Sequence, residues 1–217
     1  MPALLLGHAF WVIGPMALGL GVLGLRHARR RLVERLGHLA TRRGGRLISE
    51  PWYLTPRVEW TIGGVRLTVS VRGEAEASRR NGQRTFVHSA SASYPTLELE
   101  LLRVEHAGGD AEPLATRGAD FERAFRAVTD DPRRARELVD GELRHALLAF
   151  DPAHDLRVRL GQASAYRDGL WHHHEREQRL EISLHGLPED GEVLEALLKL
   201  ARGLHEHLER HGARRAA

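Results

Sequence analysis

The amino-acid sequence predicts an α+β protein in which an N-terminal transmembrane helix precedes an antiparallel β-meander, a helix, a small second antiparallel sheet and a C-terminal helix. Residues 3–25 contain no Asp, Glu, Lys or Arg, which is typical of a membrane span. Apolar residues alternate with polar ones in residues 58–101 and again in residues 156–184, as in half-buried strands. They recur at helical spacing in residues 132–150 and 193–208.

The first segment, residues 3–25, is long enough to cross a bilayer. As a helix it would measure about 34 Å, against a hydrocarbon core of about 30 Å. It lacks a positively charged start and a small-residue cleavage site, which argues against a cleaved signal peptide. Arginines follow the segment and none precede it, so the positive-inside rule predicts an external N-terminus and a cytoplasmic domain. We therefore expect a single-pass protein of the inner cell membrane.

A stripe of small residues runs along one side of this predicted span. Small residues at such spacing let two helix backbones approach closely in lipid, so the stripe predicts a homo-oligomer or a membrane-protein partner. The alternative interpretation is that glycine is simply frequent in membrane helices. The predicted helix-packing residues are Gly14, Ala17, Gly21 and Gly24.

The basic charge of the chain is concentrated directly after the span. Residues 26–46 contain eight arginines and one glutamate, a charge of +7, so the rest of a chain of formal charge +3 carries about −4. This distribution argues against a nucleic-acid partner and favours contact with anionic lipid headgroups. Leu32, Leu36 and Leu39 recur at helical spacing, which predicts an amphipathic juxtamembrane helix that ends at Gly44–Gly45. The predicted membrane-interface residues are Arg26, Arg29, Arg30, Arg31 and Arg35.

The remaining chain is expected to form one soluble domain over residues 47–212, with a short tail at 213–217. Glycine pairs mark hairpin turns within its first half: Gly63–Gly64 separates two alternating segments, and Asn81–Gly82 separates the next two. With the alternating leucines of residues 97–101, these segments predict a meander of four or five strands. The chain has no cysteine, so disulfides and cysteine-bound metals are excluded.

The second half begins with a loop at residues 106–119, followed by a short helical turn or strand entry at residues 121–128. Asp131 before Pro132 predicts a helix start, and the apolar spacing predicts one continuous helix up to Phe150. The alternating segments at residues 156–160 and 180–184 predict a second small sheet. The last helix is predicted to stop at Gly212.

The stretch FERAFRAVTDDPRRARELVDGELRHALLAF at residues 121–150, and the strand RTFVH at residues 84–88, resemble bacterial proteins of unknown function that carry such a module behind one or two membrane helices. The resemblance extends over residues 47–208. It implies a membrane-anchored α+β domain, and it brings no established activity or catalytic residue.

Histidine is abundant, with 14 residues, and forms two clusters that invite a metal-site hypothesis. His172 and His174 lie on one face of a predicted strand, with His185 on a possible neighbouring strand, and imidazoles so placed suit zinc or copper. The alternative is an ordinary polar strand face. His207 and His211 stand four residues apart on the last helix, the spacing of a helical metal pair. Cationic side chains at a helix C-terminus offer the simpler interpretation.

These patterns favour a structural or interaction role over catalysis. The chain lacks a Gly-x-Ser-x-Gly elbow, a phosphate-binding glycine loop, a dinucleotide fingerprint and a cysteine nucleophile. We therefore expect no enzyme activity and no cofactor, and a cytoplasmic domain that serves protein interaction or assembly at the membrane. The alternative is a membrane-associated, metal-dependent hydrolase that uses His172, His174 and His185. A sensor or binding module for a small ligand is the third hypothesis.

Overall fold

The computed structural model describes residues 23–24, 26–50, 55–73, 83–109, 111–116, 118–150, 155–162, 178–188 and 191–216. Within this part of the chain, no helix is both long enough and apolar enough to cross a bilayer. The predicted span falls almost wholly outside it, since only Leu23 and Gly24 of that segment are described, and both are helical.

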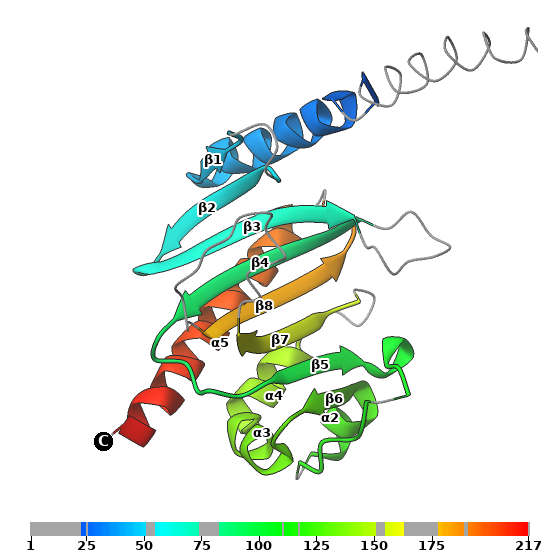
Figure 1. Cartoon of the computed structure of the whole chain (residues 1–217), viewed down its shortest axis with the longest axis vertical. Coiled ribbons are helices and arrows are strands. Elements are labelled where there is room, and N and C mark those ends of the chain that lie inside the picture. The colour runs from blue at the N-terminus through cyan, green and yellow to red at the C-terminus, as the bar shows by residue number, and fades with distance from the viewer. Residues whose placement is uncertain are drawn as a thin grey trace, which may run out of the picture.

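An N-terminal helix over residues 26–43 packs against one end of a sheet and is the blue helix at the top of Figure 1. Its apolar stripe is buried as predicted: Leu36 is fully buried, and Leu32 and Leu39 pack against the core. The helix ends at Gly44, which has a φ of +68°, and the N–H of Gly45 donates to the carbonyl of Ala40 at 2.8 Å. Such a left-handed glycine satisfies a terminal carbonyl of the helix, as the Gly-Gly signal predicted.

The described residues form one sheet of eight antiparallel strands, which follow one another from β1 at the top of Figure 1 to β6 at the bottom. The spatial order is β1-β2-β3-β4-β8-β7-β5-β6. The strands are β1 (Arg46–Ile48), β2 (Arg57–Ile62), β3 (Val65–Gly73), β4 (Gln83–Ser91), β5 (Leu99–Arg103), β6 (Phe125–Thr129), β7 (Arg157–Gln162) and β8 (Gln178–His185).

The predicted second sheet does not exist as a separate unit, and the predicted meander is interrupted. β7 and β8 lie between β4 and β5: β8 pairs with β4 so that Val87 faces Ile182, and β7 pairs with β5 so that Leu101 faces Val158. Two strands alone would bury little apolar surface and leave two open edges. Insertion into the larger sheet pairs both edges and adds their apolar side chains to one shared core.

The two faces of the sheet differ in chemistry. One face is apolar and is covered by helices, with α5 (Gly191–Ala216) running across it behind the strands in Figure 1. The other face is polar. The register aligns His88, Glu181, Arg159 and Glu100 across four strands, and His88 Nδ1 lies 3.4 Å from Glu181 Oε2. Neighbours of opposite sign in such a row stabilise the pairing of adjacent strands.

The region predicted as one helix from Pro132 to Phe150 is broken into α3 (Pro132–Leu138) and α4 (Gly141–Leu148). Before it, α2 (Ala119–Ala124) and strand β6 lie where a short helical turn or strand entry was predicted, and a 3₁₀ turn (Val104–His106) follows β5. The start is as predicted, since Asp131 accepts hydrogen bonds from the N–H groups of Arg133 and Arg134. The break at Asp140–Gly141 was not predicted, because the apolar spacing continues through it.

The last helix continues past Gly212, so the predicted stop is wrong. A Cβ atom at Gly212 would lie 1.6 Å from the carbonyl oxygen of Ser93. Gly212 is therefore the point where the backbone of α5 approaches the chain after β4, and the absence of a side chain permits that approach. This contact places the end of α5 against the segment that follows β4.

Candidate functional site

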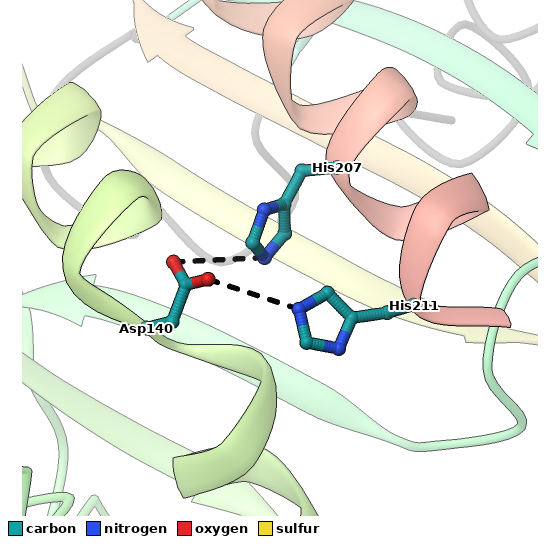
Figure 2. Close-up of side chains that lie close together, drawn as sticks. All are labelled: Asp140, His207 and His211. Carbon is teal, nitrogen blue, oxygen red and sulfur yellow. Dashed lines mark ion pairs between the residues drawn. The ribbon is translucent and has the colours of Figure 1, made fainter. Parts of the chain in front are cut away.

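Three metal-ligating side chains meet where the C-terminal part of α5 passes the junction between α3 and α4. Figure 2 shows His207 and His211 of α5 facing Asp140 at the start of α4. Asp140 Oδ1 lies 3.9 Å from His207 Nε2, and Asp140 Oδ2 lies 3.8 Å from His211 Nε2. One ligand atom from each of the three residues falls within 4.8 Å of the others.

The local sequence explains how each of these side chains is placed. Asp140 caps α4 by accepting a hydrogen bond from the N–H of Leu143 at 3.0 Å, which is the ordinary role of an Asp at a helix start. His207 Nε2 lies 2.9 Å from the carbonyl oxygen of Leu138, the last residue of α3. Because a carbonyl only accepts, Nε2 carries the proton in this arrangement. His207 therefore satisfies the end of one helix while Asp140 satisfies the start of the next.

Burial and charge differ across the cluster. The His207 side chain is 4 % exposed, whereas those of His211 and Asp140 are 25 % and 40 % exposed. Burial raises the pKa of Asp140, but the hydrogen bond from Leu143 and the nearby imidazoles outweigh it, so that the net pKa lies below its ordinary value. The cluster thus combines one rigid interior imidazole with two ligands that face solvent.

A second acid lies beside the cluster. Glu142 Oε2 is 3.9 Å from His207 Nδ1, and both Glu142 oxygens accept hydrogen bonds from Arg210 at 3.1 Å. Arg210 therefore holds Glu142 next to the outer nitrogen of His207. His211 also lines a shallow pocket with Pro95, Leu97, Arg134, Glu137 and Leu138.

The third histidine of this helix, His205, belongs to a separate buried network. Its Nδ1 shares a hydrogen bond with the hydroxyl of Tyr94, which lies 2.7 Å from the hydroxyl of Ser89. His205 Nε2 lies 3.5 Å from Glu209, which accepts from Ser91 at 2.9 Å. Burial raises the pKa of Tyr94 well above its ordinary value, so the hydroxyl stays protonated at neutral pH. The network ties α5 to β4.

A buried ion pair lies at the opposite end of β4. Arg84 is 2 % exposed and pairs with the carboxylate of Asp155, and its Nη2 also donates to the Asp155 carbonyl at 2.8 Å. His106 and Arg157 lie 3.7 Å from the same carboxylate. The opposite charges of Arg84 and Asp155 thus lie next to each other inside the fold.

The predicted strand cluster of histidines is only partly described. His185 is exposed at the end of β8, while His172 and His174 lie outside the described residues. The cluster that the structure does bring together contains the helical pair His207 and His211, whose spacing the sequence showed. Its third member, Asp140, was missed. An Asp-Gly pair inside a helical pattern was the available signal for a helix start there.

The predicted membrane-interface arginines lie on the N-terminal helix. Arg26, Arg30, Arg31 and Arg35 are exposed, whereas Arg29 is half-buried and donates a hydrogen bond to the carbonyl of Ser49. Their contact with lipid stays a prediction. Of the predicted helix-packing residues, Gly24 is described and has open space around its Cα. The other three, Gly14, Ala17 and Gly21, lie outside the described residues.

These observations define a class: an α+β domain with one antiparallel sheet, helices on one face and an exposed basic helix at its N-terminus. Comparison with solved structures finds a protein of similar fold. The chain is similar to the mycobacterial trehalose monomycolate transport factor A, TtfA, at a TM-score of 0.53 and 11 % sequence identity, over 83 % of this chain and 96 % of that chain. At this identity the similarity shows a shared fold. No known protein family matches the chain, and no curated protein matches its sequence.

Proposed function

We propose that this chain is a single-pass inner-membrane protein whose cytoplasmic α+β domain binds a protein partner and assists the transport of an envelope lipid. The observation that carries this proposal is the fold shared with TtfA, a transport factor for a mycolate lipid, over nearly the whole of that chain. In this proposal the domain is an accessory factor with no catalytic activity of its own.

The N-terminal helix supports a position at the membrane surface. It joins the predicted span to the domain, and its exposed arginines suit contact with anionic headgroups, each worth about 1 kcal/mol near such a surface. The helix is also tied to the domain. Besides the burial of Leu36, Arg43 Nη1 pairs with Glu195 of α5 at 2.6 Å. A domain attached in this way would face the membrane in a defined orientation.

The apolar core contains a small cavity within the part of the chain that the structure describes. It lies between the sheet, α3, α4 and α5 and is lined by eight leucines and Val158. Sites for lipid-sized ligands generally need several hundred Å³ and a few placed polar groups, so this cavity does not suit a lipid. In the proposal, a membrane partner moves the lipid and this chain organises that partner.

Deletion of the gene in its own host tests the proposal. We expect the envelope lipid to accumulate in the inner membrane, as followed by metabolic labelling and fractionation, and the full chain to restore its export. A chain that carries glutamate at the four exposed interface arginines, and keeps the half-buried Arg29, should restore export poorly although it folds. Normal lipid distribution in the deletion strain would refute the transport role.

The same strain separates the proposal from the hydrolase hypothesis. A variant with alanine at His172, His174 and His185 should restore export fully, because the proposal gives these residues no catalytic role. Failure of this variant, with normal abundance and normal melting temperature, would favour the hydrolase. A C-terminal reporter that is active only in the periplasm would contradict the proposed orientation.

A further inference from the structure

We propose that Asp140, His207 and His211 bind a divalent cation of the zinc class, which clamps the C-terminal part of α5 to the junction between α3 and α4. The three side chains come from two elements that are distant in the sequence and meet in the fold (Figure 2). The site does not depend on the membrane role proposed above, because it lies within the domain.

Binding requires the three ligand atoms to move closer together. In a tetrahedral zinc site, bonds of about 2.0–2.2 Å place ligand atoms roughly 3.3 Å apart. The distances of 3.9 and 3.8 Å run to two different oxygens of Asp140, and one ligand atom from each residue lies within 4.8 Å of the others, so these atoms must approach by up to about 1.5 Å. Asp140 and His211 are partly exposed and can rotate toward His207, which is held in the interior. The helical spacing of the two histidines keeps both rings on the same side of α5.

A cation at Nε2 of His207 must replace the hydrogen bond that this nitrogen makes. In the present arrangement Nε2–H donates to the carbonyl of Leu138. When a cation takes the Nε2 lone pair, this hydrogen bond is lost, the ring turns away from the carbonyl, and the ring proton moves to Nδ1, which lies 3.9 Å from the Glu142 carboxylate. A carboxylate that accepts from the outer nitrogen is the usual support of a metal-bound histidine. Glu142 is held in position for this by Arg210.

The ligand set selects the class of cation. Two imidazoles and one carboxylate suit zinc, cobalt or nickel, whereas calcium and magnesium prefer sites made entirely of oxygen. Three protein ligands leave a fourth position for water, on the side where Asp140 and His211 face solvent. The pocket lined by His211 adjoins this side of the cluster.

A purely structural role explains the same contacts without a cation, since Asp140 caps α4 and His207 satisfies the end of α3. The two interpretations differ in one measurable property, which is saturable metal binding. They also differ in whether Asp140→Asn should weaken metal binding. Asparagine caps a helix as well as aspartate does, so this variant keeps the structural role and loses the anionic ligand.

The test uses the full chain in detergent, stripped of metal with a chelator and titrated with Zn²⁺ against a chromophoric competitor. We expect each chain to bind one Zn²⁺ ion tightly and to melt at a higher temperature when Zn²⁺ is present. When cobalt replaces zinc, we expect the visible absorption of tetrahedral Co²⁺. His211→Ala and Asp140→Asn should each weaken binding about tenfold or more. His185→Ala, at an exposed histidine of β8, is the matched control and should bind as the wild type does.

Three results would overturn the proposal. One is the absence of saturable Zn²⁺ binding in the wild-type chain. Another is unchanged affinity in both His211→Ala and Asp140→Asn, with both variants folded by circular dichroism. The third is loss of binding in His185→Ala or in a variant with alanine at His172 and His174, which would move the site to the strand cluster. His207 is not substituted in the main test, because it is buried and its replacement would also affect folding.

Discussion

Replacement of Gly212 by alanine should destabilise the protein, whereas the same replacement at Gly203 in the same helix should stabilise it. At Gly212 the new Cβ would lie 1.6 Å from the Ser93 carbonyl oxygen and 2.8 Å from the Ser93 carbonyl carbon. The two backbones must separate by about 1.4 Å before the shorter contact reaches even 3.0 Å. At Gly203 nothing lies within 4 Å of the new atom.

The expected magnitudes follow from this contrast. Overpacking against backbone costs about 1–3 kcal/mol, while alanine in an open helical position stabilises by about 0.5–1 kcal/mol relative to glycine. The two variants should thus differ by about 1.5–4 kcal/mol in free energy of unfolding. For a domain of this size, that corresponds to roughly 3–16 °C in melting temperature. If the last turn of α5 detaches instead, the difference falls at the lower end of this range.

Thermal and urea unfolding of the full chain in detergent, followed by circular dichroism, measures the difference. Because Gly212 follows His211 directly, Gly212→Ala should also weaken Zn²⁺ binding if the cation site is correct, while Gly203→Ala should leave it unchanged. The close approach of α5 to Ser93 would be refuted if Gly212→Ala melted at or above the temperature of Gly203→Ala.

Three further predictions concern single contacts. Asp131→Ala should lower the free energy of unfolding in urea by about 0.5–2 kcal/mol, because α3 loses its N-terminal cap. Asparagine can still cap the helix, so an equal loss in Asp131→Asn would contradict this explanation. Arg84→Met should cost about 3 kcal/mol in free energy of unfolding because the buried Asp155 carboxylate loses its paired guanidinium and keeps the more distant Arg157. The double variant Arg84→Met, Asp155→Leu should recover at least half of that stability, and no recovery would count against the ion pair. Burial raises the folded-state pKa of Tyr94, so the stability that its protonated hydroxyl contributes is present below the unfolded pKa of about 10 and is lost as pH rises further. The difference in free energy of unfolding between wild type and Tyr94→Phe should therefore shrink above that pH. A difference that stays constant would refute this linkage.

Local signals in the sequence predicted the types of most elements. Alternation identified most strands but not β1 or β6, the Gly63–Gly64 turn joins β2 to β3 as expected, and the cap at Asp131 starts α3. The basic helix of residues 26–43 ends at the predicted glycines. Each of these features depends on neighbours within a few residues along the chain, so a short window contains the information that specifies it.

Two of the three residues of the candidate site could be predicted from the sequence. The four-residue spacing of His207 and His211 places both imidazoles on one side of a helix, which is a local property. Asp140 joins them only because α5 packs against the junction of α3 and α4, and no local pattern encodes that contact. The strand cluster of histidines, the other candidate metal site, has only His185 among the described residues.

The α+β class, the types of most elements and the positive charge of the N-terminal helix follow from local patterns, because periodicity and charge can be seen in a short stretch of chain. The insertion of β7 and β8 between β4 and β5 does not, since strand pairing depends on burial shared between segments that are distant along the chain. The tertiary structure also decided that α5 continues past Gly212, where the close approach of Ser93 requires a glycine that a sequence pattern reads as a helix stop.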